Sequence, residues 1–492
     1  MKLTQLLHYL NIDNILNIQQ QEIIIQSLQV DSRKVNRGDL FIAVPGSTSD
    51  GRQYISQAID NGAMAVFAEI PYSNKSNIDS DVPIVCIEEL TKKIGIIAKY
   101  FYNNIGLNII GVTGTNGKST VCYYIAEILK GLSCSCATIG TLGIGINNKY
   151  IATEHTTPDP IELQKNLSYI RDKKTCNIAM EVSSHALIQH RASGVDFKTA
   201  VFTNLTQDHL DYHKNISSYW QAKLKLFLEY SVDNVIINLD DPYGRQLVEL
   251  LPTHINVIGY SLEKYRKFTD NIIRAYDFKY DLQGTSVTIK SKYGEMELTI
   301  PVFGDFNLSN ILAAFAAVLT FGYSFEEILS VLPEVSAVPG RMQYIRNDLK
   351  PLVVVDYAHT PDAIDRTLAT LKKYCKGKLW CVFGCGGDRD KDKRPAMLER
   401  AICYSDYIIL TQDNPRTEDP NKITEDILKN NSNFNNIIVE LDRFTAIKIA
   451  IDKAKEKDII LVAGRGHEEH QIIGKEKIPF SDVKVVEELL EL

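Results

Sequence analysis

The segment from Asn108 to Thr120, NIIGVTGTNGKST, constrains the fold of this chain more than any other part of the sequence. β-Branched residues lead into a glycine-rich turn that ends in Lys118, Ser119 and Thr120, and a helical pattern follows over 121–129. In a strand–loop–helix unit of this kind, backbone N–H groups converge on a polyphosphate and the helix N-terminus adds partial positive charge. Lys118 can reach the terminal phosphates, and the Ser119 hydroxyl can hold Mg²⁺.

The glycine spacing differs from that of the general P-loop. Glycines stand at 111, 114 and 117, and Val112 occupies the position of the first P-loop glycine. The segment is therefore a P-loop variant. A tight turn with a surface lysine is the alternative, which is disfavoured because glycines, a lysine and two hydroxyls coincide at one strand-to-helix junction.

Length and pattern predict three α/β domains. The chain has 492 residues, which suggests roughly three domains of ~150 residues each. Strand-like and helix-like segments alternate through most of it, as is typical of folds with parallel sheets. We expect an N-terminal domain over 1–104 that ends in an amphipathic helix over 91–102, a central P-loop domain over 105–338 and a C-terminal domain over 339–492.

Charge and cysteine usage exclude several classes of protein. The net charge of −7 argues against a nucleic-acid binder, which normally carries a basic patch. No apolar run approaches the ~20 residues of a membrane span, and the N-terminus lacks the pattern of a secretion signal. Nine scattered cysteines without a metal-ligand pattern fit a reducing cytosol, so we expect a cytoplasmic protein without membrane insertion.

Six apolar runs end directly in Gly, His, Asp, Glu or Arg residues. These runs cover 178–181, 199–203, 352–356, 379–383, 407–411 and 459–463. Open α/β sheets bind ligands outside the carboxyl ends of their strands. Six such endings in two domains predict two facing edges around one cleft.

Glu181 and His209 follow two of these strands in the P-loop domain. Together with the Ser119 hydroxyl, a carboxylate and an imidazole could hold Mg²⁺. A salt bridge at the strand end is the alternative for Glu181, and a histidine satisfied by Asp208 and Asp211 is the alternative for His209. The spacing alone leaves both interpretations open.

Four other polar residues have ordinary structural interpretations. Lys223 lies in a helical segment, where a solvated lysine is expected. Asn307 and Asn310 open an alanine-rich helix, where capping is expected and contact with an adenine edge is the alternative. Arg341 follows a Pro–Gly turn, and a surface arginine is favoured over a phosphate clamp.

Arg389 and Arg416 stand on neighbouring strand-end loops of the C-terminal domain. The planar guanidinium group binds carboxylates in bidentate fashion, so two arginines at one edge suggest an acidic small-molecule substrate. Loop salt bridges with Asp388, Asp390 or Glu418 are the alternative, and the sequence does not separate the two.

The combined motifs resemble those of the Mur ligases over nearly the whole chain. The matching motifs are GTNGKST at 114–120, EVSSH at 181–185, NLTQDHLDYH at 204–213, DYAHTP at 356–361, GCGGDR at 384–389 and DNPR at 413–416. The last motif looks like the family's diaminopimelate signature, at which lysine-adding relatives differ. The resemblance implies a small N-terminal α/β domain for a UDP-sugar, a central P-loop-type ATPase domain with a mostly parallel sheet, and a mobile Rossmann-like C-terminal α/β domain for an amino acid.

The resemblance also implies roles for individual residues of this chain. ATP would contact Gly114, Thr115, Asn116, Gly117, Lys118, Ser119, Thr120, Asn307, Asn310 and Arg341, and Mg²⁺ would be held by Ser119, Glu181, His209 and a carbamylated Lys223. The UDP-N-acetylmuramoyl-L-alanyl-D-glutamate substrate would contact Val30, Ser32, Thr156, Thr157, Ser183, Gln189 and Arg191, with Ser47, Thr48 and Ser49 as further candidates. Diaminopimelate would contact Arg389, Asp413, Asn414, Pro415, Arg416, Gly464 and Glu468.

The implied reaction is ATP-dependent addition of meso-diaminopimelate to UDP-N-acetylmuramoyl-L-alanyl-D-glutamate in peptidoglycan precursor synthesis, with Lys118, Lys223, His209 and Glu181 as catalytic residues. A carboxylate needs activation before an amine attacks it, so an acyl-phosphate intermediate is expected. Because water would hydrolyse this intermediate, closure of the third domain is expected to exclude water from it. We expect a monomer. The alternatives are a lysine-adding ligase, a folylpolyglutamate-synthetase-like ligase and a non-catalytic nucleotide-binding module.

Overall fold

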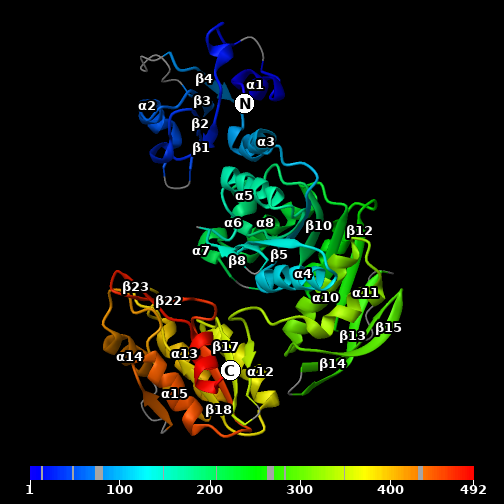
Figure 1. Ribbon diagram of the computed structural model, residues 1–492, viewed down its shortest axis with the longest axis vertical. Coiled ribbons are helices and arrows are strands. Elements are labelled where there is room, and N and C mark those ends of the chain that lie inside the picture. Colours follow the sequence, from blue (N-terminus) through cyan, green and yellow to red (C-terminus); the bar gives the residue numbers. More distant parts are fainter. Residues whose placement is uncertain are drawn as a thin grey trace. The chain divides into compact units, whose positions relative to one another are not determined.

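A computed structural model of the chain describes residues 1–12, 15–46, 49–72, 81–147, 149–153, 155–206, 208–262, 271–281, 284–347, 349–429 and 436–492 (Figure 1). Two compact units are present, and each is described by itself. One comprises Met1–Tyr276, Thr288–Met296 and Ser309–Leu332, and the other comprises Asp277–Val287, Glu297–Leu308 and Pro333–Leu492. The three-domain boundaries expected at 104 and 338 stay predictions.

The N-terminal part of the first unit is a small sheet with helices on both faces. Its parallel strands pair in the order β1 (Ser27–Gln29), β2 (Asp39–Ala43), β3 (Ala65–Glu69) and β4 (Ile84–Ile87). Successive residues of β2 alternate between two cores because strand side chains point to opposite faces. Leu40 and Ile42 pack with α1 (Leu3–Tyr9) and α3 (Leu90–Tyr102), whereas Phe41 and Ala43 pack with α2 (Ile55–Asp60).

The central sheet has its P-loop strand, β5, between two parallel neighbours, β9 and β10. The sheet order is β15-β14-β13-β12-β11-β10-β5-β9-β6-β7-β8. The strands β13, β12, β11, β10, β5, β9 and β6, which are neighbours in this order, all pair in parallel. At the end of the sheet, β6 pairs antiparallel with β7, and β7 pairs antiparallel with β8. The strands are β5 (Asn108–Thr113), β6 (Cys136–Gly140), β7 (Gly143–Ile146), β8 (Lys149–Ile151), β9 (Asn177–Glu181), β10 (Phe197–Phe202), β11 (Asn234–Asn238), β12 (Asn256–Ser261), β13 (Ile272–Asp281), β14 (Gly284–Ser291) and β15 (Gly294–Ile300).

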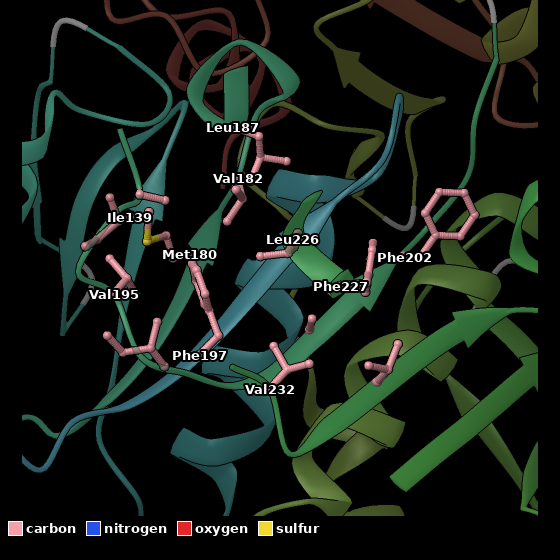
Figure 2. Close-up of a cluster of buried hydrophobic side chains, with 14 of the residues drawn as sticks. Ile139, Met180, Val182, Leu187, Val195, Phe197, Phe202, Leu226, Phe227 and Val232 are labelled. Carbon is pink, nitrogen blue, oxygen red and sulfur yellow. The ribbon is translucent and has the colours of Figure 1, made fainter. Parts of the chain in front are cut away.

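Helices bury their apolar sides against this sheet. One core combines strand residues such as Met180 and Phe202 with Leu187 of α6 and Phe227 of α8 (Figure 2). Full burial of one side chain of this size stabilises the folded protein by about 1.5–3 kcal/mol relative to leaving that side chain exposed. The helices are α4 (Lys118–Gly131), α5 (Pro160–Asp172), α6 (Ser184–Ile188), α7 (Leu210–His213), α8 (Ile216–Leu228), α9 (Pro242–Leu250), α10 (Asp305–Leu319) and α11 (Phe325–Val331).

The second unit contains a sheet covered by helices on both faces. The order is β16-β17-β21-β18-β19-β20, and only β16 runs antiparallel to its neighbour. In β17, Leu352 and Val354 join a core with α12, α13 and α14, while Val353 and Val355 join another with α15 and α16. The elements are β16 (Gln343–Ile345), β17 (Leu352–Asp356), α12 (Pro361–Tyr374), β18 (Leu379–Phe383), α13 (Lys393–Tyr404), β19 (Tyr407–Leu410), α14 (Pro420–Leu428), β20 (Ile437–Val439), α15 (Arg443–Lys453), β21 (Ile459–Ala463) and α16 (Asp482–Leu490), with a separate hairpin of β22 (His470–Ile473) and β23 (Glu476–Pro479).

Local sequence signals account for several helix starts. In α5, α9 and α14 an aspartate caps the helix and proline takes the first helical position, and Thr360 with Pro361 does the same for α12. The capping oxygen satisfies a backbone N–H that the helix leaves unpaired, and proline lacks the N–H that would be unpaired there.

The predicted elements that bear polar residues are confirmed. The six runs expected as strands correspond to β9, β10, β17, β18, β19 and β21, and the P-loop strand and helix are β5 and α4. Within each sheet these strands run parallel, so their carboxyl ends share one edge. In the part of the chain that the structure describes, no helix is both long and apolar enough to cross a membrane.

Candidate functional site

The turn between β5 and α4 has room for glycine alone at two positions. Gly114 and Gly117 have φ values of +152° and +88°. A Cβ at Gly114 would lie 1.9 Å from Thr203 Oγ1, and one at Gly117 would lie 2.5 Å from Asn310 Oδ1. The backbone therefore approaches its neighbours as closely as a phosphate cradle requires.

Residues after β10 hold this loop in place. The main-chain N–H of Thr115 donates to Asn204 O at 2.8 Å, and that of Asn116 donates to Asn204 Oδ1 at 2.9 Å. Thr203 Oγ1 donates to Asn116 O at 2.6 Å. Thr203 and Asn204 thus hold the loop in this shape by hydrogen bonds to Thr115 and Asn116.

Lys223 is not the solvated lysine that its helical context suggested. The side chain is 1% exposed, and Nζ donates to Gly114 O at 2.8 Å. The Tyr219 ring lies 4.4 Å from this Nζ, and the Tyr219 hydroxyl is 3.3 Å from Thr115 Oγ1. Burial, and secondarily the charge of Lys118, lowers the pKa of Lys223 well below its usual value. The residue's place inside the fold, which local sequence does not report, decides its environment.

Lys118 turns back onto the loop that precedes it. Its Nζ donates to the main-chain oxygens of Gly114 and Thr115, each at 2.9 Å. The residue stays partly exposed at the first position of α4. Its ammonium group therefore lies at the glycine-rich turn, where the terminal phosphates of a nucleotide bind in P-loop proteins.

Glu181 and Ser119 line the same small pocket, together with Gly140 and Gly143. Glu181 is 2% exposed, and its Oε1 accepts the Thr141 N–H at 2.8 Å. Among the residues that the structure describes, no cationic side chain forms an ion pair with Glu181, so the salt-bridge interpretation is wrong. A buried carboxylate beside a hydroxyl is a donor set that suits Mg²⁺.

His209 lies at a surface cluster of aromatic and imidazole rings. Its Nε2 is 3.4 Å from Asp208 Oδ2 and its side chain is 48% exposed, while its ring centroid lies 5.0 Å from that of His185. The contact with Asp208 agrees with the alternative in which neighbouring carboxylates satisfy this histidine. The side chain of Asp211, the second carboxylate of that alternative, lies outside the described residues. Within the described ranges, no group of three or more His, Cys, Asp or Glu residues forms a metal site, so the ligand role of His209 stays a prediction.

The residues expected around the muramoyl-peptide form one connected network. Thr157 Oγ1 donates to Glu181 O at 2.9 Å and accepts the Ser183 N–H at 3.2 Å. Arg191 donates to Thr157 O at 3.2 Å and to Gln189 Oε1 at 2.9 Å.

Thr156 extends this network toward β6, because its hydroxyl lies 3.2 Å from that of Thr141. In the N-terminal sheet, Val30 follows β1, and the buried Ser32 donates to Gln57 Oε1 at 2.9 Å. Ser47 and Thr48 lie outside the described residues, and Ser49 lies inside them.

Two structural interpretations of polar residues are wrong. Asn307 and Asn310 do not cap α10, because this helix begins at Asp305 and both asparagines lie within its first two turns. Asn310 Oδ1 borders Gly117 in the phosphate loop. Arg341 is not an ordinary surface arginine: it is half-buried, and its guanidinium carbon lies 5.0 Å from the Tyr357 ring centre.

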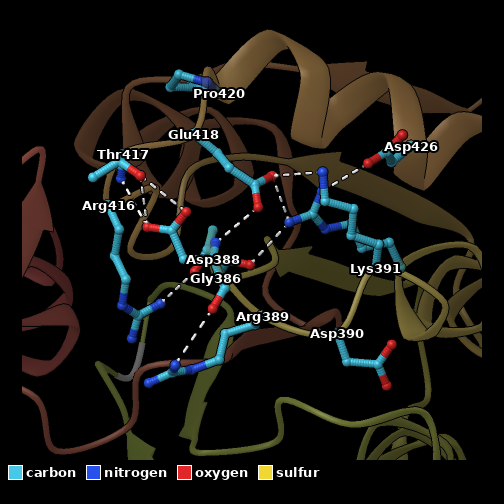
Figure 3. Close-up of polar contacts among 12 residues, drawn as sticks. Gly386, Asp388, Arg389, Asp390, Lys391, Arg416, Thr417, Glu418, Pro420 and Asp426 are labelled. Atoms are coloured by element: carbon cyan, nitrogen blue, oxygen red, sulfur yellow. Dashed lines mark hydrogen bonds and ion pairs between the residues drawn. The ribbon is translucent and has the colours of Figure 1, made fainter.

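Arg389 and Arg416 flank Gly386 on the loop after β18. A Cβ at Gly386 would lie 3.0 Å from Arg416 Nη1 and 3.8 Å from Arg389 Cγ. Arg416 Nη1 donates to Gly387 O at 2.9 Å, and Arg389 Nη1 donates to Asp388 O at 3.4 Å (Figure 3).

The neighbouring carboxylates are bound elsewhere. Asp388 accepts hydrogen bonds from Thr417, and Glu418 accepts from Asp388 N and from the buried Arg394 (Figure 3). In the described part of the chain, no carboxylate forms an ion pair with Arg389 or Arg416, so the structure does not form the loop salt bridges that the sequence left open as the alternative. Both guanidinium groups remain able to bind an added carboxylate.

The loop 413–416 and the loop after β21 meet at the same edge. Asn414 Nδ2 donates to Glu468 Oε2 at 2.8 Å. Burial raises the pKa of Glu468, and the Asn414 hydrogen bond opposes this shift. A Cβ at Gly464 would lie 2.5 Å from Asp413 Oδ2, and Pro415 O packs against Gly387 in the same way. The structure thus brings the expected amino-acid site residues together within the second unit.

Comparison with known families covers most of this chain. Residues 24–102 match the model described as "Mur ligase family, catalytic domain", 112–318 match "Mur ligase middle domain", and 340–466 match "Mur ligase, glutamate ligase domain". A curated protein of Coxiella burnetii named UDP-N-acetylmuramoyl-L-alanyl-D-glutamate--2,6-diaminopimelate ligase is 43% identical over 95% of this chain and 96% of its own length. The chain belongs to the Mur ligase family.

Two further proteins named as the same ligase resemble this chain over nearly its full length, and a more distant enzyme shares the fold. A Buchnera aphidicola protein of the same name is 41% identical over 95% of this chain and 95% of its own length. A solved structure of an enzyme of that name has a TM-score of 0.75 and 35% identity, and the match covers 100% of this chain and 99% of that one. A folylpolyglutamate synthase of Mycobacterium tuberculosis, solved with ADP, shares the fold with a TM-score of 0.60, 16% identity, and coverage of 76% of this chain and 92% of its own.

Sequence reasoning missed Tyr219 in this Mur ligase. Its hydroxyl contacts the phosphate loop at Thr115 and its ring covers Lys223. The spacing of 219 and 223 was a usable signal, because residues four apart share one face of a helix. The role of Tyr219 could be recognised from this spacing only by knowing that this face of the helix is buried.

Proposed function

We propose that this Mur ligase adds meso-diaminopimelate to UDP-N-acetylmuramoyl-L-alanyl-D-glutamate, using ATP and an acyl-phosphate intermediate. The observation that carries the proposal is the pair Arg389 and Arg416, two guanidinium groups on adjacent loops without carboxylate partners among the described residues. The names of the relatives that match over nearly the full chain support the same reaction.

The first step belongs to the phosphate loop. The D-glutamyl carboxylate attacks the γ-phosphorus of ATP, the bond to the bridging oxygen breaks, and ADP leaves. Lys118 and the N-terminus of α4 stabilise negative charge that develops on the phosphoryl oxygens. Thr157, Ser183, Gln189 and Arg191 hold the muramoyl-peptide, and Val30 and Ser32 hold the uridine end.

Asn310 borders the phosphate loop, which supports a role for it and Asn307 in ATP binding. Arg341 completes the proposed set of ATP residues. Ser119 and Glu181 fit Mg²⁺ because both line one pocket and offer oxygen donors. When bound, Mg²⁺ would neutralise further phosphate charge, and His209 and the carbamate of Lys223 would be its additional ligands.

Lys223 is suited to carbamylation because burial favours its neutral amine. The nitrogen lone pair of the neutral amine attacks the carbon of CO₂, a C–N bond forms, and one C–O π bond breaks as its electrons move to oxygen. The nitrogen then releases a proton to solvent. The product is an anionic oxygen ligand of the kind that Mg²⁺ prefers.

The second step uses the amino acid held by the C-terminal unit. Arg416 and Arg389 bind the distal carboxylate of diaminopimelate. Glu468, which the Asn414 amide holds by a hydrogen bond, binds the distal ammonium group of diaminopimelate. The other amine, in its neutral form, then attacks the acyl carbon. A C–N bond forms, the C–O bond to phosphate breaks, and the nitrogen releases a proton to solvent. Lysine lacks the distal carboxylate, and leaving the arginines unpaired costs about 1–3 kcal/mol.

Release of ADP in the presence of UDP-N-acetylmuramoyl-L-alanyl-D-glutamate tests the proposal, with meso-diaminopimelate compared with L-lysine. Strong dependence on diaminopimelate supports the reaction and the role of the arginines. Equal rates with lysine would retain the ligase but reject the arginine-based selectivity. Absence of release with either amino acid would reject the proposed reaction. A monomeric, cytoplasmic enzyme completes the proposal.

A further inference from the structure

The loop that carries Arg416 is held by the separate hairpin formed by β22 and β23. The Arg416 N–H donates to Ile472 O at 3.1 Å, and the Gly474 N–H donates to Arg416 O at 2.7 Å. Both main-chain groups of Arg416 are therefore paired with the hairpin, and Arg416 and Ile473 form a parallel bridge.

This pairing matters because Arg416 adopts an unfavourable backbone conformation. Its φ is +51°, a left-handed value that a residue with a Cβ adopts only when its surroundings impose it. The hairpin supplies hydrogen bonds on both sides of the residue. These hydrogen bonds hold Arg416 in the conformation that places its guanidinium group beside Gly386.

Gln471 secures the start of the same loop. It is 8% exposed, and its Nε2 donates to Asp413 O at 2.6 Å. The next residue, Ile472, donates its N–H to Asn414 Oδ1 at 2.8 Å.

Asn414 is oriented by these hairpin contacts. Because Oδ1 accepts a main-chain N–H, the amide must turn Nδ2 toward Glu468, where it donates at 2.8 Å. Arg465, which is fully buried, adds a 3.4 Å contact from Nη1 to the same Oδ1 and donates to Phe480 O, at the foot of the hairpin, at 3.0 Å.

We infer that the hairpin is a positioning element for amino-acid selectivity, and that Gln471 is its positioning residue. Gln471 itself touches the loop backbone and acts through Asp413, Asn414 and Arg416. The inference rests on the proposed function for the identity of the amino acid. It goes beyond that function by assigning selectivity to a residue outside the proposed set of substrate-binding residues.

The test compares the wild-type enzyme with Gln471→Met, which keeps a similar side-chain volume and removes the donor. Lys477→Ala is the matched control, because Lys477 is exposed on β23 of the same hairpin. Steady-state kinetics give KM for ATP, for the UDP substrate and for diaminopimelate. Hydrogen exchange of the segment 413–417, measured by mass spectrometry, reports loop order without any substrate.

We expect Gln471→Met to raise KM for diaminopimelate about tenfold, equivalent to ~1.4 kcal/mol, and to lower the preference over lysine. KM for ATP and for the UDP substrate should stay unchanged, and exchange over 413–417 should become faster. Lys477→Ala should match wild type in every measurement. A merely structural role would instead alter all three KM values together, and this result would overturn the inference.

The failure of the inference can be separated from failure of the proposed function. If wild type selects diaminopimelate but Gln471→Met keeps its kinetics and its exchange rates, the positioning role is wrong and the function stands. If the wild-type enzyme shows no activity with diaminopimelate, the proposed function is wrong, and so is the role of Gln471 in selectivity. Should Gln471→Met not fold, Gln471→Glu, a near-isosteric change, is measured in its place by the same criteria.

Discussion

Lys118 and Lys223 donate to the same main-chain oxygen, that of Gly114, at 2.9 Å and 2.8 Å. The first lysine begins the helix after the phosphate loop, and the second projects from α8. Burial, and secondarily the charge of the neighbouring Lys118, lowers the pKa of Lys223 and favours its neutral amine.

Replacing Lys118 with alanine should abolish ATP turnover. Loss of a charged donor at the transferring phosphoryl group lowers kcat by about 10²–10³-fold or more. ADP release with saturating substrates measures the effect. Lys130→Ala is the control, because Lys130 lies on the same helix and is paired with Glu127 at the surface; a Lys118→Ala enzyme with turnover similar to this control would contradict the assigned role.

Lys223 should bind CO₂ as a carbamate. Its lowered pKa leaves more neutral amine at neutral pH than an ordinary lysine has, and only the neutral amine reacts with CO₂. With ¹³C-labelled bicarbonate, NMR should show one carbamate signal in wild type and none in Lys223→Met. Lys225→Met, two residues along the same helix, should keep the signal, and its loss there would point to a different lysine.

Arg416→Ala should remove most of the preference for diaminopimelate over lysine. The arginine's contribution to binding a distal carboxylate is of the order of 1.5–3 kcal/mol, so kcat/KM for diaminopimelate should fall roughly 10- to 150-fold. The value for lysine should change little. Arg400→Ala, an exposed change on α13, serves as control. A parallel loss for both amino acids would indicate general damage to the loop.

Acidification should weaken amino-acid binding. Because Glu468 has a raised pKa, the weakening should begin at a higher pH than it would with an exposed glutamate in this place. Burial raises the pKa of Glu468, so this carboxyl takes up its proton, and loses its attraction for an ammonium group, before an exposed glutamate does. KM for diaminopimelate measured against pH should rise on the acid side. In Glu468→Gln this rise should disappear, and its persistence would assign the titration to another group.

The stability of the C-terminal unit should depend on one buried ion pair. Arg443 Nε lies 2.7 Å from Asp482 Oδ1, and both side chains are fully buried. Asp482→Asn leaves the arginine charge uncompensated, which costs about 3–5 kcal/mol. Thermal unfolding should show a clearly lowered Tm. The control is Asp452→Asn, which breaks the exposed pair between Asp452 and Lys448 on α15, the helix of Arg443. This change should leave Tm nearly unchanged. Equal losses of Tm in the two variants would contradict the role of the buried pair.

Much of the architecture was accessible from the sequence. Periodicity and turn residues located β5, α4 and the six polar-ended strands, because these signals act over a few neighbouring residues. Local reasoning was wrong for Lys223, Asn307, Asn310 and Arg341, whose surroundings come from residues far away in the chain.

The same division holds for the amino-acid site. The order of residues along the chain places Arg389 and Arg416 directly after two strands, and motif resemblance suggested their role. Folding is needed to establish that Asp388 and Glu418 bind Thr417 and Arg394 instead, and that Gln471 holds Asp413. Hydrogen-bond partners compete across loops that only folding brings together, so the outcome depends on distances that local sequence patterns do not encode.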